Sequence, residues 1–516
     1  MRSFIQRHAD KIVGVLSGFD RLVFRGTLRR IAFAAGMRHF LWKRQVLLKD
    51  FAAYVQTVTQ EVREASVATA KKIGRRVEYL PSSRTNKEEV ALKIAERDGV
   101  SEGLICVLEC VEPCMTFEVH RNREKKLLEL RPRTTKCKFL YHYSIDRVFG
   151  LMNARVQTWF PFNVQVCING REWLARTLDR QGVGYERRDN CFARIDDVEK
   201  AQTLMDRQLE IAWPKELARI ARMLNPAHGR IFKGIPAGYY WSVYQSEWAT
   251  DVMFRDARSL AEIYRPLVLH GITTFSSGDV MRFLGRKVTG AFQGEVVSDF
   301  KDRPEGIRLK HRAGENSVKV YDKQGSVLRA ETTINDPSGF KVFRAKEGDS
   351  NGQREWLPMR RGIADLHRRA EVSQASNERY LEALAAVETS TPLGRLLGSV
   401  SRPVSWNGRR VRGLRPWAED DLALLRAITR GEFCLNGLRN RDLQPILFEK
   451  AASTPEEQRR RSARISRKLR LLRAHGLIHK LPKSHRYRLS DRGRQLATAV
   501  LAAHELSLER LNKAAA

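Results

Sequence analysis

The stretch Thr454–Arg494, TPEEQRRRSARISRKLRLLRAHGLIHKLPKSHRYRLSDRGR, predicts a helix, a short basic hairpin and a second helix. Thr454 can cap the first helix, and Pro455 suits its first turn. Gly476 is the residue type that ends a helix, and a Pro-Lys-Ser-His turn then separates two short strands. Ser490 can cap the last helix. The first helix has one apolar face, formed by Ile465, Leu469 and Leu472.

Helix, basic hairpin, helix is the order of a winged helix-turn-helix domain, and this segment resembles the MarR-like winged-helix regulators over roughly the last fifth of the chain. The resemblance implies contact with nucleic acid, and duplex DNA is the expected partner. Arginines on the exposed helix face would reach base edges, and the hairpin would hold the phosphate backbone. The alternative is a solvated, arginine-rich surface helix. The residues expected to bind nucleic acid are Arg460, Arg464, Arg467, Arg470, Lys480, Lys483 and Arg486, together with Arg409 and Arg410.

The charge balance of the whole chain agrees with a polyanionic partner. The 516 residues include 93 Lys plus Arg against 59 Asp plus Glu, which gives a formal net charge of +34. Binding to such a partner should weaken steeply with salt. An anionic membrane is the competing partner, but no apolar run approaches the length of a bilayer span and no signal-like core follows the first residues. Seven cysteines without a secretion signal predict reduced thiols in a cytoplasm.

The pattern of elements predicts an α+β protein, in which a large mixed α/β body with antiparallel sheets precedes the winged helix. The length of the chain favours several domains. Residues rich in Gly, Pro, Ser and Arg before Trp417 indicate a basic linker that could contact phosphates. The expected domains are an N-terminal α/β domain with a central β-meander (1–213), a middle α+β domain with a three-stranded meander (214–390), the linker (391–416) and the winged helix (417–516).

The N-terminal hundred residues are predicted to be mainly helical. Phe4–Leu16 has an amphipathic pattern, and Phe51–Ile73 reads as a long helix rich in Ala and Val. Between them, FDRLVFRGTLRR (19–30) alternates poorly and is expected to be a loop. Strand, helix and strand follow within 77–108, an order that favours parallel pairing. Residues 115–169 then alternate like a series of short strands.

A second informative stretch, GIRLKHRAGENSVKVYDKQGSVLRAETTIND (306–336), predicts three consecutive antiparallel strands. Its Gly-Glu-Asn and Gln-Gly-Ser triplets are turn signals. Period-two alternation sends the apolar residues to one face of this meander and charged or aromatic residues to the other. The polar face could bind a phosphodiester and a metal ion, and it collects Arg308, Lys310, Lys319, Tyr321, Arg329 and Glu331.

The segments VYDK (320–323) and LRAE (328–331) resemble a strand motif of rolling-circle replication initiators, which join a tyrosine covalently to DNA with help from a divalent metal. The resemblance implies Tyr321 as the nucleophile, with Asp322 and Glu331 as ligands of Mg²⁺ or Mn²⁺. Neighbouring lysines and arginine would favour the tyrosine anion. The chain departs from the largest initiator group because it has no His-hydrophobic-His pair, and alternation places Asp322 on the opposite face unless a bulge intervenes. The competing interpretation is an ordinary hairpin with Lys–Glu and Arg–Glu pairs.

Two other groups of residues could carry chemistry. Three strands, a helix and a strand within 136–195 resemble a ribonuclease-H-like order, in which Asp146, Glu172 and Asp196 would form the acid set for metal-dependent cleavage. Acids at such positions are also common as caps and turns. A cysteine group has a spacing that zinc tolerates, but buried core thiols are the favoured interpretation. The group consists of Cys106, Cys110, Cys114 and Cys137, with His120 nearby.

The leading hypothesis is a mobile-element protein, either transposase-like or replication-initiator-like, that recognises DNA through its winged helix. A simple repressor would not need so large a body. One alternative is a non-catalytic winged-helix regulator with a large sensing or oligomerisation body. Another is an RNA-binding protein that uses basic patches and exposed aromatic rings. The sequence leaves open whether the chain is an enzyme and whether it forms a homo-oligomer.

Overall fold

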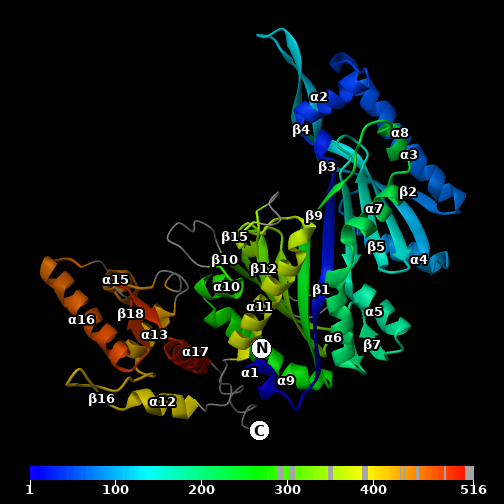
Figure 1. The fold of residues 1–516 in the computed structure, drawn as a ribbon. Coiled ribbons are helices and arrows are strands. Elements are labelled where there is room, and N and C mark those ends of the chain that lie inside the picture. The colour runs from blue at the N-terminus through cyan, green and yellow to red at the C-terminus, as the bar shows by residue number, and fades with distance from the viewer. Residues whose placement is uncertain are drawn as a thin grey trace.

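One large sheet dominates the structure, a computed structural model that describes residues 1–275, 277–286, 296–301, 308–346, 352–385, 393–429, 433, 437–448, 452–481 and 484–505. Its strands are β1 (Ile12–Thr27), β2 (Arg76–Leu80), β3 (Gly103–Asn122), β4 (Leu127–Asp146), β5 (Gly150–Gln157), β6 (Val164–Asn169), β9 (Tyr240–Phe254), β10 (Val296–Lys301), β11 (Arg308–Ala313), β12 (Asn316–Lys323) and β13 (Val327–Ile334). These eleven strands lie in the order β10-β11-β12-β13-β9-β1-β6-β5-β4-β3-β2 (Figure 1). All neighbours pair antiparallel except β2 and β3.

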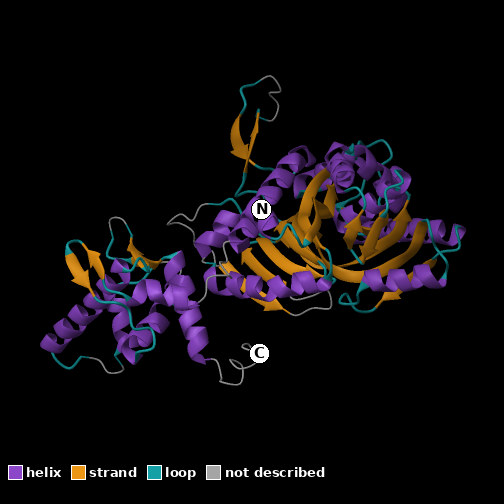
Figure 2. Ribbon diagram, turned by 90° about the horizontal axis from the view of Figure 1, so that it is seen from below, coloured by secondary structure: helices purple, strands orange, loops and turns teal. Residues whose placement is uncertain are grey.

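Helices lie on both sides of this sheet, as Figure 2 shows. In the N-terminal and middle parts they are α1 (Arg2–Arg7), α2 (Ala34–Lys43), α3 (Phe51–Lys72), α4 (Lys87–Arg97), α5 (Gly170–Arg180), α6 (Val198–Asp206), α7 (Trp213–Leu224), α8 (His228–Ile231), α9 (Ala257–Thr274), α10 (Ser277–Phe283) and α11 (Leu366–Ala385). Two small hairpins accompany them, β7 (Tyr185–Arg188) with β8 (Cys191–Ile195), and β14 (Lys341–Arg344) with β15 (Glu355–Pro358). None of the helices in the described ranges has both the length and the apolar character needed to cross a membrane.

Strand β1 runs through the middle of the sheet, between β9 and β6. Two sequence-based predictions are wrong here, the helix over Phe4–Leu16 and the loop over 19–30, because residues 12–27 form this strand and only Arg2–Arg7 is helical. The register with β9 shifts between Phe19 and Arg21, which leaves Asp20 in a β-bulge. Each such shift moves the side-chain pattern by one residue, so the strand shows no clean period of two in the sequence.

One face of the sheet, here the helix face, is covered by two groups of helices. Helices α9, α10 and α11 pack over β9 and β11–β13, where their apolar side chains form a core with Leu309, Val318 and Val320. Helices α3 and α7 pack farther along, against residues such as Leu140 and Ala154. The cross-strand pairing places the residues of both groups on the same side of the sheet. The apolar half of the predicted meander therefore faces the main helical layer.

The other face, here the polar face, is covered at two places. Helix α4 packs over β2–β4 with a core that includes Cys106 and Cys110. Helix α6 and the β7–β8 hairpin pack over β1, β9 and β13. Between these covers, polar side chains of neighbouring strands stay exposed or half-buried. They are Arg21 on β1, Gln165 and Cys167 on β6, and Asn153 and Arg155 on β5.

Several predicted elements are confirmed. Helix α3 agrees with the long helix expected from Phe51, and β2, α4 and β3 form the strand–helix–strand unit with parallel pairing. The meander forms as β11, β12 and β13 with turns at the two predicted triplets. The alternating residues of 115–169 form parts of longer strands, since β3 and β4 pair over 19 positions. Strand β9 lies beside β1, so the sheet takes strands from both sides of residue 214.

The C-terminal elements form a group of their own (Figure 1), and their apolar side chains share one hydrophobic core. They are α12 (Leu393–Ser401), β16 (Val404–Trp406), β17 (Arg409–Val411), α13 (Glu419–Ile428), α15 (Asn440–Leu447), α16 (Pro455–Ala474), β18 (Ile478–Lys480), β19 (Tyr487–Leu489) and α17 (Asp491–Glu505). Residues 391–416, which the composition predicts to be a linker, thus hold a helix and a hairpin. Val400 is fully buried and packs with Leu396 and Leu397 in this core, an apolar pattern that the arginine-rich composition hides.

Gly170 lets helix α5 begin against the bulge of β1, because a Cβ atom at this position would lie 1.8 Å from the carbonyl oxygen of Phe19. We expect Gly170→Ala to lower the free energy of unfolding by about 2–4 kcal/mol, since the backbone itself must move. Urea denaturation followed by circular dichroism measures this loss. In the control Gly229→Ala the added methyl meets nothing within 4 Å. The control should change stability by less than about 1 kcal/mol, and equal stability of the two variants would contradict the close approach.

Candidate metal centre and nucleic-acid interface

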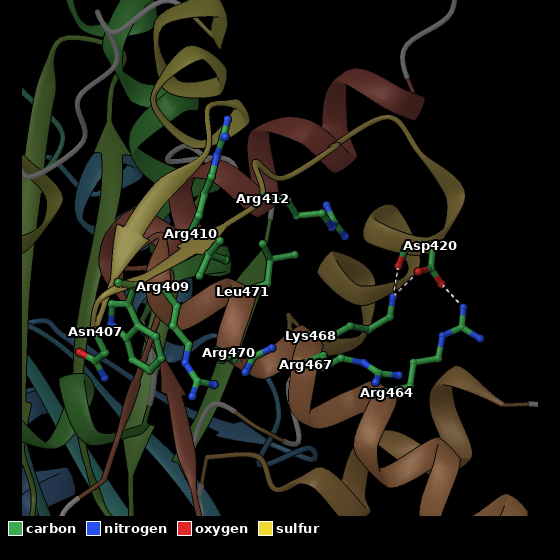
Figure 3. A pocket seen from close by; sticks show the side chains of 12 residues that line it. Asn407, Arg409, Arg410, Arg412, Asp420, Arg464, Arg467, Lys468, Arg470 and Leu471 are labelled. Carbon is green, nitrogen blue, oxygen red and sulfur yellow. Dashed lines mark hydrogen bonds and ion pairs between the residues drawn. The ribbon is translucent and has the colours of Figure 1, made fainter.

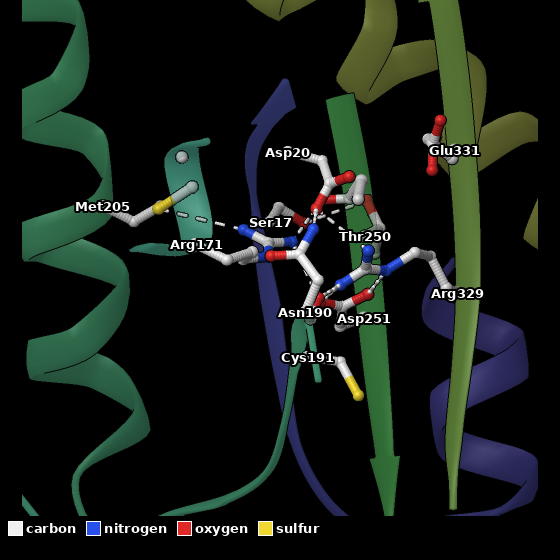
Figure 4. Close-up of polar contacts among 12 residues, drawn as sticks. Ser17, Asp20, Arg171, Asn190, Cys191, Met205, Thr250, Asp251, Arg329 and Glu331 are labelled. Carbon is white, nitrogen blue, oxygen red and sulfur yellow. Dashed lines mark hydrogen bonds and ion pairs between the residues drawn. The ribbon is translucent and has the colours of Figure 1, made fainter. Parts of the chain in front are cut away.

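A buried arginine on β13 links three strands of the sheet. Arg329 is 1% exposed and donates to both carboxylate oxygens of Asp251 on β9, at 2.5 and 2.8 Å. It also donates to Asp20 Oδ1 on β1 at 2.9 Å and to the carbonyl oxygen of Asn190 at 2.7 Å (Figure 4). The two parallel bonds to Asp251 are the strong, bidentate form of an arginine–carboxylate pair. Arg329 therefore joins the meander to the centre of the sheet.

A second buried arginine completes the charge balance. Arg171, at the start of α5, lies 3.0 Å from Asp251 Oδ2 and donates to the carbonyl oxygen of Ala249 at 3.1 Å. Asn169 caps this helix by accepting from the Arg171 and Glu172 amides, which fixes where the guanidinium enters the site. Burial alone would raise the pKa of Asp20, but Arg329 and Arg171 outweigh it and lower that pKa. Asp20 is thus an anion at neutral pH.

Three carboxylates converge beside this network. One oxygen each from Asp20, Glu247 and Glu331 lies within 4.8 Å of the others, and the three residues come from β1, β9 and β13. Asp20 and Glu331 are buried, and Glu247 is half-buried. Asp20 follows Leu16 and Gly18, which lie opposite Asp251 and Ala249, on this side of β1, and the bulge places Arg21 opposite Glu247 on the same side. Carboxylate oxygens are the ligands that Mg²⁺ and Mn²⁺ prefer, so the cluster has the donor chemistry of a divalent-cation site.

Glu247 is the acid of this cluster that has no arginine or lysine in direct contact among the described residues. Gln245 donates to it at 2.7 Å. Burial and then the Glu331 carboxylate raise the pKa of Glu247 to about 7, although Lys319 and Arg21 act against them. Two like charges in one site cannot both be stable without a proton or a cation between them. A proton or a divalent cation would balance this charge.

The structure brings Tyr321 and Glu331 together but leaves Asp322 on the opposite face. The Tyr321 hydroxyl donates to Glu331 Oε2 at 2.8 Å, and Lys319 Nζ lies 2.7 Å from Glu331 Oε1. Asp322 pairs with Leu328 in the register, on the helix face. The expectation that nearby cations favour the tyrosine anion is wrong, because burial and Glu331 raise the pKa of Tyr321 well above its usual value despite Arg329. Tyr321 is a neutral donor that holds Glu331 in place.

The ribonuclease-H-like acid set does not converge. Asp146 accepts from the amides of Val148 and Phe149 at 2.8 and 3.1 Å, which makes it a turn residue. Glu172 forms an ion pair of 2.5 Å with Arg187. Asp196 pairs with Arg194 at 2.8 Å on the surface. Each acid thus has hydrogen-bond or ion-pair partners of its own, away from the other two.

Sequence reasoning missed Asp20 and counted Glu247 only among scattered acids without placing it in a set, and two signals point to both residues. Asp20 is a lone acid inside the apolar run LSGFDRLVF, where an unpaired charge would be costly. Glu247 and Asp251 are four residues apart in a strand, which places both side chains on one face. The pairing of β9 with β1 and β13 is long-range, so no local pattern states that these acids meet.

The cysteine group lies in the core under α4. Cys106, Cys110, Cys114 and Cys137 are all buried, and Cys114 and Cys137 are adjacent across β3 and β4, with sulfur atoms 2.6 Å apart. Burial raises the pKa of the Cys106 thiol to about 12. All four thiols thus lie buried in a core, as the core interpretation predicts.

A second site is a strongly basic pocket between the β16–β17 hairpin and α16 (Figure 3). Its volume is about 730 Å³, and seven of its twelve lining residues are Arg or Lys. Asp420 pairs with Arg464 at 2.7 Å and with Lys468 at 3.0 Å. Four arginines of the pocket form no ion pair with any other described residue. These are Arg409, Arg410, Arg467 and Arg470, and all four are exposed.

The remaining residues predicted to bind nucleic acid lie outside this pocket. Arg460 is exposed on α16, and Lys480 is exposed on β18. Arg486 is half-buried and donates to the carbonyl oxygen of Gly437 at 3.5 Å. Lys483 lies outside the described residues. Arg409 and Arg410 lie on a hairpin beside α16, whereas the linker interpretation gave them no fixed structure.

Comparisons with protein-family models, curated proteins and solved structures find no match to this chain. The geometry of the two sites therefore carries the functional argument.

The raised pKa of Glu247 makes stability depend on pH. A carboxyl group whose folded pKa lies above its unfolded value stabilises the fold while protonated, and this contribution is lost as the pH rises through the folded pKa. We expect the wild type to lose about 1–3 kcal/mol relative to Glu247→Gln between about pH 4.5 and about pH 8. Urea titrations of both proteins across this range measure the difference. Glu315→Gln, at an exposed turn, is the control, and a Glu247→Gln difference with no slope or the opposite slope would contradict the assignment.

Proposed function

We propose that the protein binds duplex DNA through a C-terminal winged helix-turn-helix domain. The observation that carries the proposal is the row of exposed arginines on α16 that faces the basic β16–β17 hairpin. Arg467 and Arg470 on this helix, and Arg409 and Arg410 on the hairpin, form no ion pair with any other described residue, so they are available to phosphates and base edges. A chain with a net charge of +34 also favours a polyanion as its partner.

The order of the C-terminal elements supports the winged-helix proposal. Helices α13, α15 and α16 share one core with the β18–β19 hairpin and α17. Leu438 bridges to Tyr487, which adds a third extended segment to the hairpin. Thr454 accepts from the Glu457 amide at 3.2 Å, so the predicted cap starts α16. Ile465, Leu469 and Leu472 are buried, which turns the arginines of α16 outward.

The hairpin has a role in this proposal that the resemblance alone does not give it. A phosphate between the hairpin and α16 would meet Arg409 from one side and Arg467 and Arg470 from the other, while Arg410 points away from α16. Guanidinium groups bind phosphate in a bidentate fashion, so such a clamp fixes the position of the backbone. The recognition helix would then read bases next to a held strand.

Reversing two charges on α16 tests this proposal. We expect Arg467→Glu with Arg470→Glu to weaken duplex binding by about 100-fold at fixed salt and to reduce the slope of log affinity against log salt by about 2, because two contacts are lost. Fluorescence anisotropy with a labelled duplex at several salt concentrations measures both quantities. The matched control is Arg426→Glu on α13, an exposed arginine outside the pocket. If the control and the double variant lose the same affinity, net charge alone explains binding.

The variant Arg409→Glu with Arg410→Glu tests the contribution of the hairpin to binding independently of α16. The clamp predicts a lower salt slope in this variant too, whereas a plain winged helix predicts no change. Competition with a structured RNA at matched salt addresses the RNA-binding alternative. Stronger competition by the RNA than by an equal length of duplex would replace the DNA proposal with that one.

The carboxylate cluster favours a second function, metal-dependent cleavage of a DNA strand by a transposase-like or initiator-like mobile-element protein. Asp20, Glu247 and Glu331 would hold Mg²⁺ or Mn²⁺, and the ion would polarise a phosphate and activate its nucleophile. Lys319, Lys310 and Arg21 lie on the same face and would bind neighbouring phosphates. The neutral Tyr321 fits a positioning role, which favours water as the nucleophile over a covalent tyrosine step.

Cleavage assays with Mn²⁺ or Mg²⁺ on supercoiled and single-stranded DNA test this second function. We expect Glu247→Gln to reduce cleavage by at least about 100-fold and to abolish the rise in melting temperature caused by Mn²⁺, while duplex affinity stays unchanged. Glu315→Gln should behave as the wild type. A wild type that neither binds Mn²⁺ nor cleaves would leave the non-catalytic regulator as the better proposal. A covalent protein–DNA adduct that Tyr321→Phe removes would instead support the initiator branch.

A further inference from the structure

A cavity of about 500 Å³ lies on the helix face, between α3, α7 and the ends of β3, β4 and β5. It is separate from the carboxylate cluster, which faces the other side of the sheet, and from the basic pocket of the C-terminal region. Its size falls in the range of sites for small molecules. Neither DNA binding nor metal binding uses any of its residues, so the cavity needs an explanation of its own.

The floor of the cavity is buried and largely apolar. Met152, Ala154, Ile220 and Leu224 line it, each at most 3% exposed. Two polar residues of the floor contact each other, since Ser66 Oγ lies 2.8 Å from His142 Nε2. Burial lowers the pKa of His142 to about 4, so the ring is neutral at physiological pH. The interior therefore suits an uncharged apolar group.

The mouth of the cavity combines exposed apolar surface with positive charge. Ile73 and Met223, which both line it, are each 52% exposed and give the mouth an apolar edge. Arg147 and Arg222 are exposed at the same rim and form no ion pair with any other described residue.

The acids at the rim of the cavity do not neutralise the charge of Arg147 and Arg222. Arg219 lies 3.1 Å from Asp146 Oδ2 and 2.9 Å from Glu216 Oε2, so it is already paired. Two backbone amides also donate to Asp146. Glu102 is the other acid that lines the cavity, and it is exposed. Among the described residues that line the cavity, Glu102 is thus the acid without an ion pair, against the two exposed arginines.

We propose that this cavity binds a small amphipathic anion, a molecule with one carboxylate and an unbranched or aromatic apolar body of about ten carbons. The apolar body would fill the floor between α3 and α7 and cover Ile73 and Met223. The carboxylate would lie at the mouth between Arg147 and Arg222, where a charge keeps most of its hydration. The complementarity of an apolar interior and a cationic rim selects this class over a neutral or cationic amphiphile.

Decanoate is the probe that tests the proposal, with decanol and decyltrimethylammonium as its neutral and cationic counterparts. Isothermal titration calorimetry on the full chain, below the concentration at which the probes form micelles, should show saturable binding of decanoate. Decanol should bind at least about tenfold more weakly, and the cationic probe should not bind. Binding of the cation as tight as that of decanoate, or no saturable decanoate binding, would overturn the proposal.

Two variants locate the site. Arg147→Glu with Arg222→Glu should weaken decanoate binding by about tenfold or more, whereas Arg123→Glu, an exposed arginine remote from the cavity, should leave it unchanged. Ala154→Leu places a larger side chain in the floor and should abolish binding while circular dichroism shows the same fold. Unchanged affinity in either of these cavity variants would place the ligand elsewhere and overturn the proposal. The outcome is independent of DNA binding and cleavage, because no residue is shared with those sites.

Discussion

The ion pairs of the Arg329 guanidinium hold together the middle of the large sheet. The guanidinium lies almost fully buried between Asp251 and Asp20, and so ties three strands that are far apart in the chain. Burying one charge in a protein costs several kcal/mol unless partners of the opposite sign meet it in good geometry. Here two arginines, Arg329 and Arg171, balance two aspartates, and every contact is within hydrogen-bond distance. The site is neutral as a whole, and this is why the sheet tolerates it next to the apolar core.

The two glutamates beside these ion pairs, Glu331 and Glu247, are not balanced by positive charge in the same way. Glu331 has Lys319 and the Tyr321 hydroxyl, but Glu247 has a neutral amide as its direct partner. Its raised pKa follows from this shortage of positive charge. A proton restores the balance in the free protein, and a divalent cation would restore it while gaining three oxygen ligands. A purely structural role for Glu247 is weak for this reason, since an apolar side chain at this buried position would avoid the cost of holding the charge.

The fold could be predicted from the sequence where local signals are complete. The turns at Gly314 and Gly325 and the alternation around them were enough for the meander, and the cap at Thr454 with its apolar stripe was enough for α16. Strand β1 was not predicted, because a bulge at Asp20 interrupts the alternation of its side chains. The site could be predicted only in part, since Tyr321 and Glu331 share a face within one hairpin, whereas Asp20 and Glu247 arrive from distant segments. The charge of Arg329 was visible in the sequence, but its burial follows from the β7–β8 hairpin, which no local pattern places over the meander.

The two faces of the sheet also bear on how the proposed functions relate. Helix α17 of the C-terminal region contacts α9, which belongs to the helical layer on the helix face. The carboxylate cluster lies on the polar face, behind the sheet from that layer. The arginines proposed to bind DNA and the acids therefore share no side chain and no element, and a charge reversal on α16 does not alter the field at Glu247 through any direct contact. Recognition and chemistry in such an arrangement are separable, which is the property expected of a targeting module attached to a body that acts on the same polymer at another point.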